Sequence, residues 1–160
     1  MSVINASPLI HLSLVLPGGL AALPGLAGEI IVPREVGEEL EAGMQKDDTW
    51  LQVQGVTGIT CRTESVPLHP LLASQLDRGE AAVIQTALDE SIPTVILDER
   101  KARRLARAMG LKVTGTPGIV LLAKQRGVLP SVSAAIHASR QHGIWLEATL
   151  EKRVISLSGE

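Results

Sequence analysis

Polar side chains stand at the ends of short aliphatic runs in this 160-residue chain. Asn5 closes the apolar run that starts at Ser2, and Asp98 and Glu99 follow directly after the run TVIL. If these runs are strands of an open α/β sheet, their ends are where such sheets bind ligands. Asn5, Asp98 and Glu99 are therefore candidates for one common site.

Two glutamates on predicted helices could join them. Glu80 lies in the first turn of the helical pattern LDRGEAAVIQTALDE, and Glu39 borders an apolar stripe next to Leu40. Several carboxylates in one crevice repel each other strongly unless a cation lies between them. Hard oxygen ligands of this kind suit Mg²⁺ or Mn²⁺. The candidate metal ligands are thus Asn5, Glu39, Glu80 and Asp98, with Glu99 close by.

Each of these acids also has a purely structural interpretation. Glu80 and Glu99 could complement the positive ends of their helix dipoles, and Asp98 could cap the helix that follows it. Glu39 and its neighbouring glutamates could form a solvated helix face. Spacing along the chain does not choose between these readings.

A row of arginines follows Asp98 and Glu99 in the sequence. The apolar residues of the predicted helix ERKARRLARAMG fall on the opposite face, and Gly110 ends it. Such a row could guide a phosphate backbone toward a metal, or it could be an ordinary solvated face with cations toward the helix C-terminus. The arginines recur at spacings of three and four and are Arg100, Arg103, Arg104 and Arg107.

The elements that must position these residues follow an α/β pattern. Short aliphatic runs alternate with helical patterns, which predicts a mainly parallel sheet with helices on both faces. The segment around Cys61, TGITCR, reads as strand or loop. No linker separates domains, so one domain over residues 1–160 is expected. Strands are predicted at 2–5, 29–32, 94–98 and 112–114, and the last two helices at 131–141 and 146–154.

Composition excludes several other chemistries. The chain has 15 Lys and Arg against 17 Asp and Glu, so nucleic-acid binding would have to come from a local patch. The only aromatic residues of the Phe, Tyr and Trp types are Trp50 and Trp145, which leaves few platforms for base stacking. Trp145 is predicted to be a core or partner contact. Cys61 is the single cysteine and has no nearby histidine in sequence, and the four histidines lack zinc-ligand spacing.

The N-terminal segment is uncharged up to Glu29, and LIHLSLVL resembles the apolar part of a signal peptide. It lacks a basic start, however, and Pro8, Pro17 and Pro24 divide it into pieces too short for a bilayer core of about 30 Å. A lone cysteine suits a reducing compartment. We therefore expect a cytoplasmic protein without a membrane partner.

Five blocks in order carry a family resemblance: NASPLI, EIIVPREVGEEL, LDRGEAAVIQTAL, TVILDERKARRLARAMGLKVTGTPGIVLLAKQRG and HGIWLEATL. Together they resemble the PIN-domain family, in particular the VapC-like toxin group with its Ser-Pro-Leu-Ile start and Gly-Thr-x-Gly turn. The resemblance implies a three-layer α/β/α fold on a parallel sheet. It also implies that acidic residues hold Mg²⁺ or Mn²⁺ to hydrolyse RNA, often as the toxin of a toxin–antitoxin pair.

Carried over by position, the family's first-strand Asp falls on Asn5, its helix Glu on Glu39 and its second helical acid on Glu80. The last acid falls on Asp98 or Glu99, with Asp98 preferred because it is nearer the strand end. An amide at position 5 binds a hard cation without supplying negative charge, so weaker metal binding and reduced or absent activity are implied. Ser7 is expected to support the site or to cap the following helix.

The resulting hypothesis is an Mg/Mn-dependent endoribonuclease with an RNA substrate and a small antitoxin as partner. The alternative is a catalytically weak PIN-fold protein that binds an antitoxin or RNA without cleaving it. The mean hydropathy of +0.23 favours exposed apolar surface and a homo-oligomer, such as a dimer, although a large core would explain it equally. The number of metal ions stays open.

Overall fold

A five-stranded, wholly parallel sheet forms the centre of the computed structural model, which describes residues 1–143 and 148–160. The four predicted strands are confirmed, and the segment around Cys61 is a strand as well. The strands are β1 (Ser2–Ile4), β2 (Ile30–Val32), β3 (Ile59–Cys61), β4 (Thr94–Ile96) and β5 (Lys112–Thr114).

The central strands are aliphatic because both faces of the sheet are covered. Val3, Ile4 and Val95 are fully buried, as continuous apolar strands of parallel sheets are expected to be. At the edge, Ile59 and Cys61 of β3 are only partly buried, so that strand has a weaker apolar signal in the sequence.

The order of the strands places the strand ends that matter side by side. The sheet runs β3-β2-β1-β4-β5, so the chain moves outward from β1 to β3 and then returns to add β4 on the other side of β1. Ile4 pairs with Ile96, and the Asn5 N–H donates to the carbonyl oxygen of Ile96 at 3.2 Å. The reversal between β1 and β4 is a switch point of the kind at which doubly wound sheets bind ligands.

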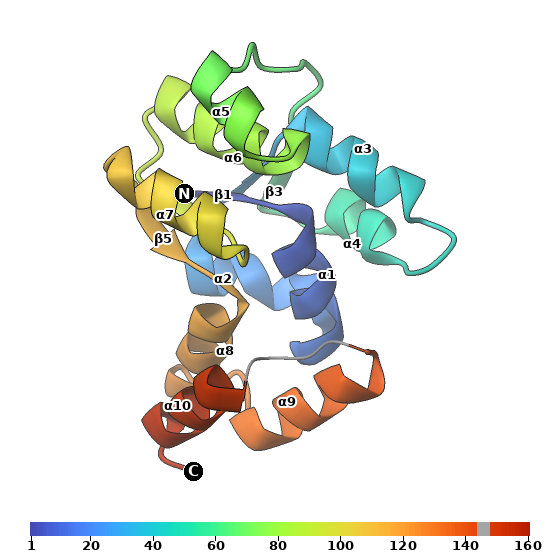
Figure 1. Cartoon of the computed structure of the whole chain (residues 1–160). Helices are drawn as coiled ribbons and strands as arrows, with labels where there is room; N and C mark the ends of the chain where they lie inside the picture. The colour runs from blue at the N-terminus through green and yellow to red at the C-terminus, as the bar shows by residue number, and fades with distance from the viewer. Residues whose placement is uncertain (144–147) are drawn as a thin grey trace.

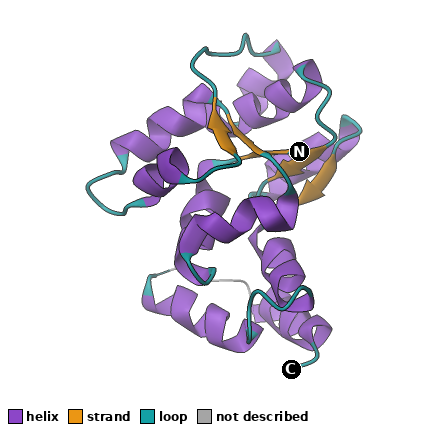
Figure 2. Ribbon diagram, turned by 180° about the vertical axis from the view of Figure 1, so that it is seen from behind, coloured by secondary structure: helices purple, strands orange, loops and turns teal. Residues whose placement is uncertain are grey.

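Helices cover the sheet on both sides and give the three-layer α/β/α arrangement that was expected (Figures 1 and 2). Helix α6 packs on β1 and β4, while α2 packs on β2 and α4 on β3. Before β4 the helical elements are α1 (Ala6–Val15), the 3₁₀ helix η1 (Gly19–Ala22), α2 (Leu23–Ala27), α3 (Arg34–Ala42), α4 (Thr49–Gly55), α5 (Pro70–Gln75) and α6 (Arg78–Asp89).

After β4 come α7 (Arg100–Ala108), α8 (Thr116–Gln125), α9 (Val132–Gln141) and α10 (Ala148–Ser158). In both views α9 and α10 lie at the opposite end of the molecule from α5 (Figures 1 and 2). The predicted helix at 131–141 is confirmed as α9. For the helix predicted at 146–154, α10 is its described part; Trp145 and Leu146 lie outside the described residues.

The predicted helix faces are largely confirmed, with two exceptions. Ala102 and Ala106 of α7 are fully buried, as expected for the face opposite the arginines. The pattern LDRGEAAVIQTALDE places Leu88 on one face with Ala81, Ile84 and Ala87, but Leu88 lies in the last turn of α6 and is 39% exposed. Val36, Leu40 and Met44 recur at a spacing of four, which predicts one helical stripe, but α3 ends at Ala42 and Met44 is 47% exposed.

Across residues 1–143 and 148–160, no single helix has the length and apolar character needed to cross a bilayer. The stretch Ala6–Val15 together with Gly19–Ala27 passes by length and composition only, with a bend of 99° at the break.

Candidate functional site

Asn5 occupies the N-cap position of α1, yet its side chain makes no capping hydrogen bond. The residue is 8% exposed, and its amide oxygen Oδ1 is buried without a hydrogen-bond partner. A buried carbonyl oxygen without a partner costs about 1–3 kcal/mol, so its persistence calls for an explanation. Helix capping by the side chain does not supply one, whereas a cation ligand would.

Oxygens from three elements converge on Gly79, in the first turn of α6. A Cβ atom at Gly79 would lie 3.1 Å from Asn5 Oδ1, 3.2 Å from Glu39 Oε2 and 3.6 Å from Asp77 Oδ1. The absence of a side chain at this position therefore leaves the space between β1, α3 and α6 to these oxygens. Asn5 and Glu39, 34 positions apart in sequence by their numbers, thus meet at one point.

Glu80 is held at this point by the start of α6. Its backbone N–H donates to Asp77 Oδ1 at 2.8 Å, and the Asp77 N–H donates to Glu80 Oε2 at 3.3 Å. This reciprocal capping box satisfies two backbone donors at the helix start. Glu80 therefore has a structural role as part of this capping box, and its residue is only 7% exposed. Asp77 was not singled out from the sequence, although its spacing to Glu80 is the signature of a capping box.

The pKa values of two carboxyls are raised by burial and by neighbouring acids. Burial raises the pKa of Glu39, and the Asp77 carboxylate raises it further, although Glu39 as a residue is exposed at the surface. Burial also raises the pKa of Glu80, followed by repulsion from Asp77, Glu99 and Glu39. We call Asn5, Glu39, Asp77, Glu80 and Glu99 the acidic crevice.

Asp98 and Glu99 turn in different directions. Glu99 Oε2 accepts from the Ala102 N–H at 2.9 Å and so caps α7, and its charge acts on Glu80. Asp98 caps a helix too, but not the helix that follows it. Its Oδ1 accepts from the Thr116 N–H at 2.7 Å, and its Oδ2 accepts from the Thr116 hydroxyl at 2.7 Å, both in the first turn of α8.

His11 of α1 completes the surroundings of Asp98, with Nδ1 at 3.2 Å from Asp98 Oδ2. Burial acts to raise the pKa of Asp98, but the hydrogen bonds from His11 and Thr116 outweigh it and lower the pKa. Both oxygens of Asp98 are therefore engaged by protein groups. Of the two candidates for the last acid, Glu99 is the one coupled electrostatically to the acidic crevice.

The arginines of α7 do not act as one row. Arg103 is half-buried and donates from Nη1 to the Leu97 carbonyl oxygen at 2.7 Å, which ties it to the end of β4. Arg100 and Arg104 are exposed and line a hollow of about 460 Å³ beside Glu99. Lys101 and Gln75, which were not singled out from the sequence, line the same hollow. Arg107 is exposed but does not line it.

Ser7 lies within the first turn of α1 and is half-buried. Asn5, and not Ser7, stands at the N-cap position, so Ser7 does not cap the helix. Among the described residues its hydroxyl makes no hydrogen bond that would link it to the acidic crevice.

A divalent cation fits the donor set of the acidic crevice only if Asn5 takes part. Within the described part of the chain, no group of three His, Cys, Asp or Glu side chains could by itself hold a metal ion. The unpartnered Oδ1 of Asn5, the neighbouring Glu39 Oε2 and the repelling carboxylates are nevertheless hard oxygen donors that a cation would satisfy.

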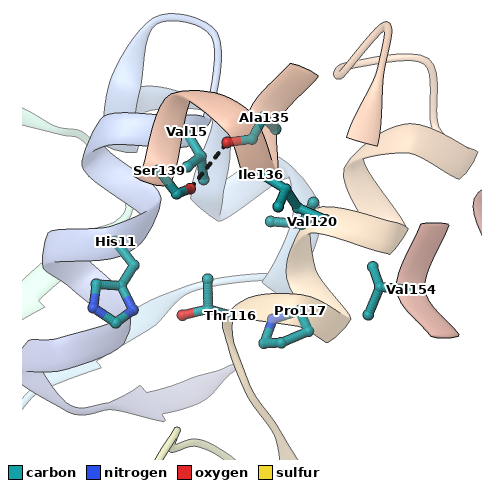
Figure 3. Close-up of a pocket in the computed structure, with 9 residues that line it drawn as sticks. All are labelled: His11, Val15, Thr116, Pro117, Val120, Ala135, Ile136, Ser139 and Val154. Atoms are coloured by element: carbon teal, nitrogen blue, oxygen red, sulfur yellow. Dashed lines mark hydrogen bonds between the residues drawn. The ribbon is translucent and has the colours of Figure 1, made fainter. Parts of the chain in front are cut away.

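A small enclosed cavity lies away from this site, between α1, α8, α9 and α10 (Figure 3). His11 and Thr116 lie on one side of it, and Val15, Val120 and Ile136 supply apolar walls (Figure 3). Its volume of about 20 Å³ is close to that of one water molecule, so it is a packing gap and not a substrate pocket.

Comparison with known proteins agrees with the fold. The family model described as a PIN domain matches residues 1–160, so the chain belongs to the PIN-domain family. PIN domains are generally nucleases and typically use divalent metals, and the chain accordingly has a nuclease-type fold. No curated protein and no solved structure matches the chain in the corresponding searches.

Proposed function

We propose that this protein is an Mg²⁺- or Mn²⁺-dependent ribonuclease of the VapC-like toxin type, with the acidic crevice as its active site. The observation that carries the proposal is the buried, unpartnered Oδ1 of Asn5 next to Glu39 Oε2. Family membership supports nuclease chemistry in general. The RNA substrate and the toxin role rest on the resemblance of the sequence blocks.

Asn5, Glu39, Glu80 and Glu99 are the residues proposed to hold the cation. A bound divalent cation supplies an activated water and stabilises negative charge on the phosphodiester. Asp77 fixes the position of Glu80 through the capping box. We assign Asp98 a positioning role, because both of its oxygens accept hydrogen bonds from Thr116. It holds the end of β4 against α8 and thereby sets the direction of Glu99.

The hollow beside Glu99 is the proposed path for the RNA backbone. Arg100, Lys101 and Arg104 would attract phosphates there without reading bases. Arg103 has a different task, since its guanidinium donates to Leu97. The lining has no aromatic side chain, which favours backbone contacts over base stacking.

A second candidate function is binding of RNA without cleavage. Asn5 is the observation that favours it, because an amide supplies one negative charge fewer than the aspartate of the family pattern. A weaker metal site would lower turnover while the cationic hollow still bound RNA.

Cleavage of labelled single-stranded RNA separates the two functions. With Mn²⁺ the chain is expected to cleave the RNA, Asn5→Asp to cleave it faster, and Glu80→Gln to cleave it at least about tenfold more slowly, since a charged ligand is lost. Chelation should stop the reaction. Glu64→Gln, an exposed acid outside the acidic crevice, is the matched control. RNA binding with no turnover in either the wild type or Asn5→Asp would favour the second function.

The toxin role also implies partners. We propose that the chain self-associates and binds a small antitoxin through apolar surface on its helices. Leu71 of α5 is 43% exposed, which leaves such surface available. A strictly monomeric species in light scattering at high concentration would contradict the self-association. A neighbouring small reading frame whose product forms a complex with the chain would support the antitoxin.

A further inference from the structure

A second hollow, much larger than the packing gap, lies between the strand-end loops and the C-terminal helices. Its volume is about 590 Å³. Its apolar lining includes Val113, Leu121, Leu150 and Leu157. Its arginines are Arg100, Arg103 and Arg153. We call this hollow the α8–α10 groove. It lies outside the acidic crevice, and of its lining the nuclease proposal uses only Asp98, Arg100 and Arg103.

Helix α10 brings an apolar stripe to this groove. Leu150, Val154 and Leu157 recur at spacings of four and three, so they share one face of the helix. Val154 is 5% exposed and packs into the core, whereas Leu150 and Leu157 are 39% and 59% exposed. The helix is therefore anchored through the middle of its stripe, and the leucines on either side remain uncovered.

The exposure of these leucines argues for an open groove and against a small-molecule pocket. Pockets for small ligands bury most of the ligand surface, which walls as exposed as Leu157 do not provide. The seven positions from Leu150 to Leu157 span about 10 Å, or two helical turns. That length suits a helical segment laid into a groove with apolar anchors at i, i+4 and i+7.

The charge of the groove lining indicates what kind of partner would bind there. Among the described residues, Arg100 and Arg153 have neither an ion pair nor a side-chain hydrogen bond. Asp98 also lines the groove, but its oxygens are bonded to Thr116 and His11. The free charge of the groove is therefore positive, and a partner with carboxylates flanking its apolar stripe would complement it.

Two other occupants fit less well. A second copy related by a two-fold axis would place this patch against itself, so that Arg153 would face the arginines of the other copy. RNA would meet cations but also exposed leucines, and none of the lining residues is Phe, Tyr or Trp. We infer that the α8–α10 groove binds an acidic amphipathic helix of a partner protein. This inference goes beyond the proposed nuclease function and does not depend on it.

The test is a binding experiment on the full chain. A displayed library of helical peptides carries leucine at i, i+4 and i+7 and has Glu, Gln or Lys at the flanking positions. Selection on the chain is expected to enrich Glu at those flanks. The enriched peptide, labelled and followed by fluorescence anisotropy, should bind at least about tenfold more weakly to Arg153→Glu, Leu157→Ser and Leu150→Ser, as expected for central anchors of an interface.

Each variant has a matched control. Lys152→Glu makes the same charge change at the neighbouring exposed position of α10, which does not line the groove. Leu51 is 60% exposed and Leu88 is 39% exposed, so Leu51→Ser and Leu88→Ser match the two leucine variants in exposure. All three controls should bind the peptide as the wild type does.

Several results would overturn the inference. These are no enrichment of acidic peptides, enrichment of Lys, or equal binding to the groove variants and their controls. A dimer in light scattering that Leu157→Ser dissociates would assign the groove to a second copy. Binding of labelled RNA that is lost in Leu157→Ser but kept in Leu51→Ser would assign it to RNA.

Discussion

At the residue scale, the acidic crevice brings together carboxyl groups whose ionisation is unfavourable. Glu39 and Glu80 both have raised pKa values because burial and neighbouring carboxylates disfavour ionisation. An amide at position 5 reduces that repulsion when no cation is bound. It also reduces the charge available to a cation, so the same substitution favours the metal-free fold and disfavours metal binding.

Glu80→Gln separates these two effects. Glutamine can still accept from the Asp77 N–H and preserve the capping box, while the charge is removed. We expect the thermal midpoint of the metal-free chain at neutral pH to stay the same or to rise. Calorimetric Mn²⁺ titration should show affinity lowered by at least about tenfold. Unchanged Mn²⁺ affinity would contradict Glu80 as a ligand, and Glu64→Gln is the control for a general charge effect.

Metal binding should depend on pH in a range set by these two acids. Protons compete with the cation for Glu39 and Glu80, and their raised pKa values move the loss of affinity above the ordinary glutamate range. Mn²⁺ affinity is therefore expected to fall in the interval from neutral pH down to the ordinary glutamate pKa of about 4.3, before ordinary carboxylates are protonated. Calorimetric titrations at both ends of this interval test it. A flat profile would mean that neither group contacts the metal.

The stability of the metal-free chain changes with pH in the opposite direction to its Mn²⁺ affinity. An acid whose pKa is raised by folding contributes stability below its unfolded pKa, and that contribution is lost as the pH rises through its folded pKa. With respect to Glu39 and Glu80, mild acid therefore stabilises the metal-free chain while it weakens the metal site.

At the scale of elements, the first turn of α6 forms the floor of the site. Gly79→Ala should favour the helix by up to about 1 kcal/mol, because alanine is the better helix former. Its methyl group would, however, crowd Asn5 Oδ1 and Glu39 Oε2. We expect unchanged or higher stability in urea unfolding together with about tenfold weaker Mn²⁺ binding, the usual scale for disturbing the support of a metal site.

Gly25→Ala is the matched control, since a Cβ at that helical position meets nothing within 4 Å. If Gly79→Ala bound Mn²⁺ as tightly as Gly25→Ala, the oxygens around Gly79 would not be metal ligands.

The junction between β4 and α8 depends on Asp98. Asp98→Asn should lower the free energy of unfolding by about 1–3 kcal/mol, because the bonds from Thr116 and His11 are weakened. The pKa of Asp98 is lowered in the fold, so its contribution is present above the unfolded pKa and is lost as the pH falls through the folded pKa. Urea unfolding at neutral and acid pH measures both.

The same variant distinguishes the two candidates for the last metal ligand. Asp98→Asn should leave Mn²⁺ affinity essentially unchanged, whereas Glu99→Gln should weaken it, since the Glu99 carboxylate acts on Glu80. The reverse result would restore Asp98 as the ligand, as its place at the strand end suggested.

At the scale of the whole molecule, Glu160 ties the C-terminal helices together. Its carboxylate accepts from the Val132 N–H at 2.8 Å and the Ser133 N–H at 3.0 Å, and pairs with Lys124 at 3.0 Å. These contacts join the end of α10 to the start of α9 and to α8. The backbone N–H donors, followed by the other contacts, hold the pKa of Glu160 well below its usual range.

Glu160→Gln should therefore loosen the start of α9. We expect faster amide hydrogen exchange at Val132 and Ser133, and no change for Glu41→Gln, an exposed acid of α3. Because the pKa is lowered by folding, acid should have the same effect on the wild type as the pH falls through the folded pKa. Equal exchange in Glu160→Gln and the wild type would show that the carboxylate does not hold these helices.

The sequence by itself determined the elements and the polar positions at their ends. Strand and helix periodicities report directly which side chains are buried, so β1, β2, β4 and β5 and the buried faces of α3, α6 and α7 could be predicted. The parallel order of the sheet then brings Asn5 beside the end of β4. The resemblance of the five blocks to the PIN-domain family implied nuclease chemistry for those positions.

Only the tertiary structure decided where the side chains at those positions point. Asp98 and Glu99 are adjacent in sequence, yet one turns to Thr116 and the other to Ala102 and the acidic crevice. That choice depends on α8, whose first turn lies beside the end of β4 only in the folded chain. Arg103 likewise leaves the row of arginines because the Leu97 carbonyl oxygen is within its reach. Periodicity carries no information on such contacts, because they join residues that no repeat along the chain relates.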